Sequence, residues 1–177
     1  MEETEVPIEA AQEHINEAAA HSSHKWITYV ALSSALLAVL AAVTALLSGH
    51  HVNEAMISQI KSSDKWNYYQ AKGIKSAILD SRIQVLEGLG KEISKKDSDK
   101  VAEYKAEQGQ ISQEAEEFQK ESEAHLLIHE ILARAVTMFQ VAIAIGAIAA
   151  LTRRKYFWYV SLVFGAVGSF YFIQSLI

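Results

Sequence analysis

Four histidines, at two places in the chain, have the residue type and spacing to bind a transition metal. His50 and His51 are adjacent, whereas His125 and His129 are four residues apart and would share one face of a helix. Two imidazoles and a carboxylate such as Glu54 can bind zinc or copper. Protonation of these histidines at about pH 6 could instead act as a switch. The plainer alternative is that all four are ordinary polar residues on a seam between helices.

Aromatic residues gather at one place outside the apolar stretches. Trp66, Tyr68, Tyr69 and Gln70 predict either a recognition surface or packing within a helix bundle. The sequence has no cysteine, no glycine-rich phosphate loop and no nucleophile–base motif, so we expect neither catalysis nor a cofactor. A net charge of −5 without a basic stripe argues against binding to nucleic acid.

Three stretches without a charged residue must position these side chains. They cover residues 27–47, 135–151 and 156–177. Each is close to the length of about 20 apolar residues that a helix needs to cross a bilayer. A long charged region separates the first stretch from the second, and Pro7 is the only proline in the chain. Uninterrupted helices are therefore possible everywhere after Pro7.

We therefore predict an all-α integral membrane protein with three transmembrane helices and the lipid bilayer as its surroundings. An acidic, histidine-containing N-terminal segment is expected at residues 1–25. The transmembrane helices are expected at 26–48, 131–151 and 156–177, and a long, coiled-coil-like extramembrane helical hairpin at 49–130.

The hairpin is predicted from regular spacing in both of its arms. Steps of three and four residues indicate a coiled-coil seam in the second arm, at Val101, Tyr104, Gln108, Ile111, Ala115, Phe118, Ser122, His125, His129 and Leu132. The first arm has a spacing nearer an eleven-residue period, at Ile60, Ser63, Asn67, Ala71, Ile74, Ile78, Arg82, Val85, Leu89 and Ile93. Either the hairpin folds on itself through these seams, or several copies form a bundle.

The lengths of the two arms add a constraint. The first arm would run to Ser94, and Asp97 or Ser98 would cap the second, which makes the first arm the longer one. A helix break near residues 61–64 would make the arms match, and residues 50–60 would then form a separate joint at the membrane surface. The alternative is one unbroken helix that is staggered against its partner.

The only short loop predicts the orientation. Arg153, Arg154 and Lys155 indicate that this loop is cytoplasmic, because positive charge in short loops tends to stay inside. The N-terminus is then also cytoplasmic, and the hairpin and the C-terminus lie on the other side of the membrane.

Small residues recur at every fourth position in the spans and predict close packing of helices. They include Ala142, Gly146, Ala150, Ser161, Gly165 and Ser169. Together with the polar residues on the seams, they favour a homo-oligomer over a lone, flexible hairpin.

A non-enzymatic scaffold, assembly factor or accessory subunit fits these features best. It would act through self-association or through another membrane protein or complex. One alternative is an oligomeric channel, for which Thr137 and Gln140 are the suggestive polar pair, and a second is the metal-binding or pH-responsive protein that the histidines suggest. The three uncharged stretches contain no ionisable residue other than tyrosine, which argues against coupled transport.

One motif supports a comparison with a known family. The stretch Asp64-Lys65-Trp66-Asn67-Tyr68-Tyr69-Gln70-Ala71-Lys72 resembles a bacterial membrane-protein family, the uncharacterised domain of unknown function 4337, and the similarity extends along nearly the whole chain. The resemblance implies a bacterial inner membrane, and hence a periplasmic hairpin and C-terminus. It implies no activity and no site residues.

Overall fold

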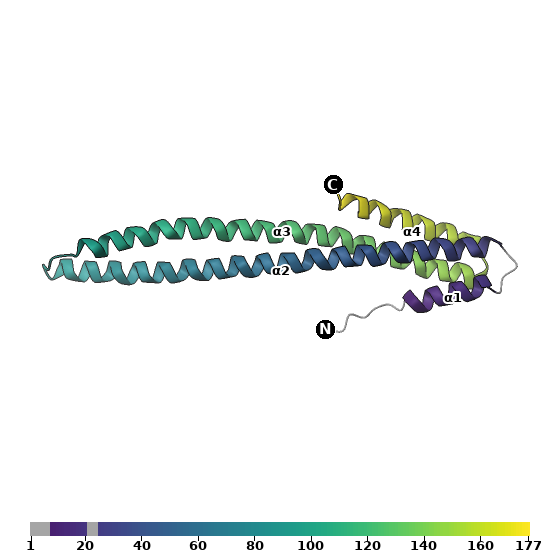
Figure 1. The fold of residues 1–177 in the computed structure, drawn as a ribbon, viewed down its shortest axis with the longest axis horizontal. Helices are drawn as coiled ribbons and strands as arrows, with labels where there is room; N and C mark the ends of the chain where they lie inside the picture. The colour runs from purple at the N-terminus through teal and green to yellow at the C-terminus, as the bar shows by residue number, and fades with distance from the viewer. Residues whose placement is uncertain (1–7, 21–24) are drawn as a thin grey trace. The chain divides into compact units, whose positions relative to one another are not determined.

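The computed structural model describes residues 8–20 and 25–177, and these residues form four α-helices and no strand. The helices are α1 (Ile8–Ala20), α2 (Lys25–Gly88), α3 (Lys95–Thr152) and α4 (Lys155–Gln174) (Figure 1). The all-α prediction is therefore confirmed for the described part of the chain. Of the predicted N-terminal segment 1–25, residues 1–7 and 21–24 lie outside the described residues.

The described helices divide into two compact units. Unit 1 contains α1, α4, the part of α2 up to Val52 and the part of α3 from Leu127 onward. Unit 2 contains the rest of α2 and α3, with the turn between them. Three of the helices, α2, α3 and α4, are long and apolar enough to cross a membrane. The three apolar stretches predicted from the sequence lie in these three helices, except that the last three residues of the third stretch follow the end of α4 at Gln174.

Unit 1 packs α2, α3 and α4 around a core of small and apolar residues. The buried residues of one cluster are Leu37, Ala41, Ala135, Phe139, Ala142 and Ile143. The amphipathic helix α1 joins a second cluster, in which its fully buried Ile15 lies with Ile27, Val30, Ala147 and Ala150. The alanines let the helices approach closely, as the predicted small-residue stripes require.

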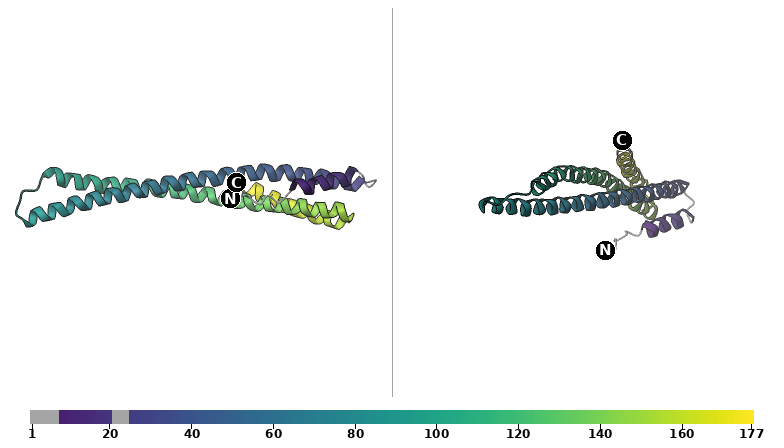
Figure 2. Two further views of the ribbon diagram at one scale, coloured as in Figure 1. Left: turned by 90° about the horizontal axis from the view of Figure 1, so that it is seen from below. Right: turned by 60° about the vertical axis from the view of Figure 1, so that its left-hand side comes forward.

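Unit 2 is an antiparallel pair of helices, and α2 and α3 lie side by side in it (Figures 1 and 2). Hydrogen bonds join Ser122 with Ala55, Ser62 with Ala115, and Gln108 with Tyr69. Both helices thus advance by seven residues from one contact to the next. On α3 the contacts use the predicted second-arm seam, and none of its six positions from Val101 to Phe118 is exposed.

The turn between α2 and α3 follows Gly88, six residues before the predicted end of the first arm. The amide of Lys91 donates to the carbonyl of Leu86, and the amide of Gly90 donates to that of Glu87. Gly90 has a φ of 65°, in the left-handed region that glycine adopts without strain. This pair of bonds with a left-handed glycine is the Schellman arrangement, which ends a helix sharply.

The predicted helix break near residues 61–64 is wrong, because α2 is unbroken from Lys25 to Gly88. Ser62 does not cap a new helix there, since its hydroxyl donates to Ala115 on α3. No break is needed once the first arm ends at Gly88, because the two arms then have similar lengths. Residues 50–60 are accordingly not a separate joint but part of α2, as the alternative prediction of one continuous helix had it.

The start of α3 also differs from the prediction. This helix begins at Lys95, and the amides of Asp97 and Ser98 donate to the carbonyl of Ser94. Ser94 therefore stands at the cap position that was predicted for Asp97 or Ser98. Asp97 lies in the first turn of α3, where a negative charge is favourable beside the helix N-terminus.

Candidate interaction surface

Small polar side chains form the inner face of α2 in unit 2. The Ser62 hydroxyl donates to the Ala115 carbonyl over 2.9 Å, and the Ser122 hydroxyl of α3 donates to the Ala55 carbonyl over 2.8 Å. Both serines are buried, and so are Ser58 and Ser76 on the same side of α2. Because the hydroxyls of Ser62 and Ser122 each reach a backbone carbonyl of the facing helix, these two bonds fix the register of the pair at a small cost in space.

A lysine held between two rings adds a charged contact to this inner face. The Lys72 ammonium lies 5.3 Å from the ring centroid of Tyr68 and 4.9 Å from that of Tyr104, and it forms an ion pair with Glu107. The hydrogen bond to Glu107 raises the pKa of Lys72, loss of hydration opposes the rise, and Tyr68 adds to it. Lys72 and Glu107 therefore join α2 to α3 as a charged pair with aromatic neighbours.

Five large aliphatic residues of α2 lie on the opposite, exposed face of unit 2, whereas Leu79, Ile83 and Leu86 are half-buried. We call this face the outer stripe and define it as Ile60, Ser63, Asn67, Ala71, Ile74, Ile78, Arg82, Val85 and Leu89. All nine residues are exposed. The five large aliphatic members each keep between 59% and 66% of their surface accessible.

The outer stripe coincides with the first-arm seam predicted from the sequence, which left open whether that seam packs within the hairpin or between copies. Of its ten positions only Ile93, in the turn, is half-buried, so the seam does not pack within the hairpin. The physical reason lies in α3, whose seam carries bulky residues such as Tyr104, Ile111 and Phe118. Small residues of α2 such as Ala55 and Ser62 leave room for these side chains, and the large aliphatic residues of the outer stripe are turned outward.

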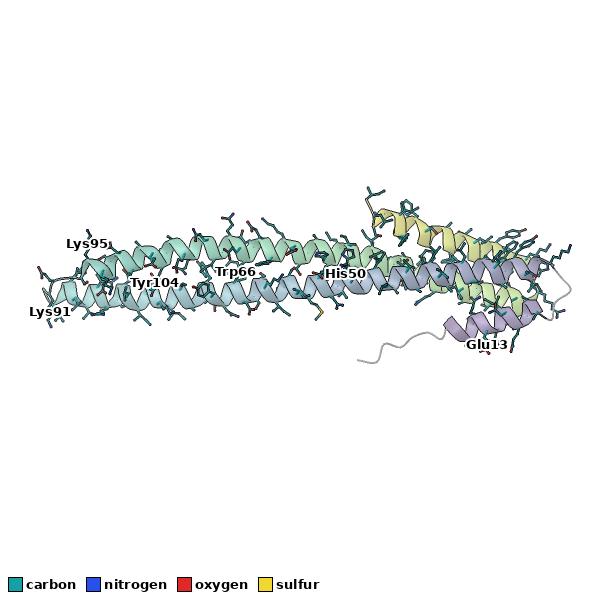
Figure 3. The ribbon with its side chains drawn as sticks, viewed as in Figure 1. Glu13, His50, Trp66, Lys91, Lys95 and Tyr104 are labelled. Atoms are coloured by element: carbon teal, nitrogen blue, oxygen red, sulfur yellow. The ribbon has the colours of Figure 1, made fainter. Side chains whose placement is uncertain are left out.

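The predicted aromatic group is divided between two surroundings. Trp66 and Tyr69 are half-buried and pack edge to face, with ring centroids 5.5 Å apart. Tyr68 and Gln70 are exposed. Figure 3 shows Trp66 and Tyr104 on the two helices of this pair, and Lys91 and Lys95 at its turn. The group thus contributes both to packing and to the outer surface.

The predicted histidine site does not come together in one unit. His50 and His51 lie in unit 1 with ring centroids 5.5 Å apart, and His129 lies in the same unit with its Nδ1 2.9 Å from the Ser48 hydroxyl. His125 is half-buried in unit 2. The residues described here contain no group of three or more histidine and acidic side chains that could hold a metal ion. The four histidines therefore enter none of the proposals below.

The predicted small-residue stripes all lie at or near helix contacts in unit 1. Ala142, Gly146, Ala150, Ser161 and Gly165 are buried, and Ser169 is half-buried. The Ser161 hydroxyl donates to the Ala142 carbonyl over 2.7 Å. Gly168, which sequence reasoning missed, packs against Phe139. Its spacing of three from Gly165 was the available signal, because residues three apart share a helix face.

Comparison with known proteins identifies a family but no activity. The family described as "Domain of unknown function (DUF4337)" matches residues 26–177. This chain belongs to the DUF4337 family. The match covers α3, α4 and all but the first residue of α2, and α1 lies before it. No curated protein and no solved structure matches the chain. DUF4337 membership thus adds no ligand or reaction to the surfaces described above.

Proposed function

We propose that this protein is a membrane-anchored, non-enzymatic scaffold or accessory subunit that acts through helix-to-helix contacts made by unit 2. One observation carries the proposal: unit 2 buries serines and exposes large aliphatic residues. A soluble surface rarely gathers several half-exposed isoleucine, valine and leucine side chains into one stripe, and such patches mark sites of interaction. The register bonds of the inner face would hold this stripe on a single, straight surface.

Charge-free spans support an anchoring role for the apolar helices. Transport coupled to ions or protons usually places ionisable residues within the membrane, and the stretches 27–47, 135–151 and 156–177 have none other than tyrosine. Thr137, one of the two polar residues that suggested a channel, donates its hydroxyl to the Ala133 carbonyl within α3. A hydroxyl satisfied by its own helix is the usual device for keeping a threonine in an apolar span.

We place the protein in a bacterial inner membrane, with the N-terminus in the cytoplasm. Arg153, Arg154 and Lys155 in the short α3–α4 connection support this orientation. The helix pair of unit 2 and the C-terminus are then periplasmic. A reporter that is active only outside the cytoplasm, fused after Lys96, should be active. An inactive reporter, with activity from a cytoplasmic reporter at the same position, would contradict this orientation.

Photo-crosslinking in native membranes tests the scaffold role directly. A photoreactive amino acid at Ile74, on the outer stripe, should form protein adducts of the same identity in independent preparations. The matched control is Gln110 on α3, which is exposed and lies off the inner seam. Protein adducts at Ile74 and few at Gln110 support the proposal. Lipid adducts alone, or equal yields at the two positions, would count against it.

A further inference from the structure

The outer stripe has the spacing of a second helix-packing seam. Its nine positions are separated by repeating steps of three, four and four residues. Ser63, Ile74 and Val85 are therefore eleven residues apart from one to the next. An eleven-residue repeat keeps a stripe almost straight along an α-helix, because three turns take about 11 residues. The inner face of α2 already contacts α3, with Ser62 and Tyr69 seven residues apart. One helix therefore carries two seams on opposite faces, and only the inner one is occupied within the described chain.

We propose that the outer stripe of α2 pairs with the outer stripe of a second copy of this chain, with the two α2 helices parallel. The inference rests on the proposed function, and it names the partner of the same surface. Knobs-into-holes packing needs a facing helix with a matching repeat, and a second α2 matches by identity. Copies inserted in one membrane share one orientation, and α2 is a single unbroken helix, so two α2 helices from such copies run parallel.

Parallel pairing brings like residues of the stripe together in layers. Ile74 and Ile78 would each pack on their counterparts, which removes exposed aliphatic surface from water. Asn67 would face Asn67 of the second copy, the arrangement that specifies register in parallel helix pairs. Arg82 is the unfavourable layer, but Asp97 of its own chain lies 3.9 Å away and supplies a counter-charge.

Residues that flank the stripe are complementary in the same parallel arrangement. On a helix, Asp64 and Lys75 lie along one side of the stripe, and Gln59 and Gln70 lie along the other. All four are exposed. In a parallel pair, a residue on the Gln59 side of one stripe meets the residue five positions further on along the Asp64 side of the partner's stripe. Gln59 would then meet Asp64 of the second copy, and Gln70 would meet Lys75, so no like charges are opposed on the flanks.

A lipid surface is a poorer occupant of the stripe. Helices that lie in the membrane interface carry a polar face rich in lysine and arginine, which anionic headgroups attract. The polar residues beside this stripe are two glutamines, one acid and one lysine, so that attraction is absent. A flat lipid surface also does not require an eleven-residue repeat. If the stripe contacted lipid instead, photo-crosslinking at Ile74 would give lipid adducts.

Disulfide crosslinking tests the pairing without disturbing the fold, because the chain has no native cysteine. The full chain with Ile78→Cys should form a disulfide-linked dimer in native membranes with a several-fold higher yield than Gln110→Cys. Adding Ile74→Glu should lower the Ile78→Cys yield several-fold. Ala77→Glu, which changes an exposed neighbour beside the stripe, should lower it less. Circular dichroism of the purified variants should show unchanged helix content, because all the replaced side chains are exposed.

Four results would overturn the pairing. Equal dimer yields from Ile78→Cys and Gln110→Cys would show that the stripe does not meet a second copy. Co-expressed Ile60→Cys and Ile78→Cys chains that link to each other more than to themselves would show antiparallel pairing. Adducts at Ile74 with a different protein would support the scaffold role and exclude this partner. Lipid adducts alone would count against both, so the two failures are distinguishable.

Discussion

The two units hold their helices together by a different balance of contacts. Unit 1 has hydroxyl bonds between helices, such as the one from Ser161 to Ala142, but it adds close steric contacts at glycines: Gly165 lies against Leu37, Gly168 against Phe139, and Gly146 against Ser34. Unit 2 adds an ion pair to the polar bonds that join a side chain to the facing helix. The difference follows the surroundings that each unit suits. Between helices apolar enough for a membrane, close packing must replace the hydrophobic effect, whereas a thin helix pair in water gains register from specific bonds.

Replacing one contact glycine tests the steric half of this comparison and has the largest expected effect. A Cβ atom at Gly168 would lie 2.8 Å from two ring carbons of Phe139 and 3.3 Å from the Ala135 carbonyl oxygen. Phe139 is fully buried, so its ring has little room to move. Gly168→Ala should lower the free energy of unfolding of unit 1 by about 1–3 kcal/mol, as measured by unfolding in detergent.

Gly49→Ala is the matched control, since it makes the same substitution in a helix of unit 1. Nothing lies within 4 Å of a Cβ atom at Gly49, so only the better helix propensity of alanine acts. A gain of about 0.5–1 kcal/mol is expected. Equal effects of the two substitutions would show that close approach at Gly168 does not hold unit 1 together.

The hydroxyl ladder of unit 2 is tested by a neighbouring pair of serines. Ser62→Ala removes the bond to the Ala115 carbonyl and should lower the free energy of unfolding of unit 2 by about 1 kcal/mol. Ser63→Ala changes an exposed side chain of the outer stripe and should leave it nearly unchanged. Thermal unfolding followed by the fluorescence of Trp66 measures both variants in chains in which Trp26 and Trp158 are replaced by phenylalanine. A larger loss at Ser63 than at Ser62 would reverse the assignment of the two faces.

How much of this structure could be predicted depended on which signal each element carried. The apolar stretches needed only their length and lack of charge, and the second-arm seam needed only its seven-residue repeat. The end of α2 was misplaced because charged residues after Gly88 continue a helical composition, whereas the left-handed Gly90 is a single-residue signal. The sequence alone does not show that the glycine at this position adopts a positive φ and ends the helix.

The face of α2 could not be predicted from the sequence, and the reason is physical. Hydrophobic ranking places Ile74 and Ile78 inside and Ser62 outside, because isolated burial favours the larger apolar side chain. In a pair of helices, however, the facing residues share one space, and α3 fills it with Phe118 and Ile111. Only the pairing reveals that α2 supplies small residues such as Ser62 opposite these side chains. The sequence alone therefore left open whether the first-arm seam packs within the hairpin or between copies.

Alkaline pH tests the ion pair between the two helices and has the smallest expected effect. The Glu107 hydrogen bond raises the pKa of Lys72 above its ordinary value near 10.5, with loss of hydration opposing and Tyr68 adding to the rise. A pKa that is higher in the folded state contributes stability that is fully present below the unfolded pKa. This stability is lost as the pH rises through the folded pKa. Unit 2 of the wild type should therefore lose part of its thermal stability at strongly alkaline pH, and Lys72→Met should show less of this loss.

Lys100→Met is the control that separates an inter-helix pair from a local one. Lys100 also has a raised pKa, chiefly through its hydrogen bond to Glu103, but both residues lie on α3, three positions apart. A pair within one exposed helix turn contributes little to the joining of two helices. Removing Lys100 should therefore change the alkaline loss less than removing Lys72 does. If the two variants change the alkaline loss of thermal stability equally, the Lys72–Glu107 pair adds nothing specific to the α2–α3 contact. Unit 2 would then depend on its hydroxyl bonds and packing alone.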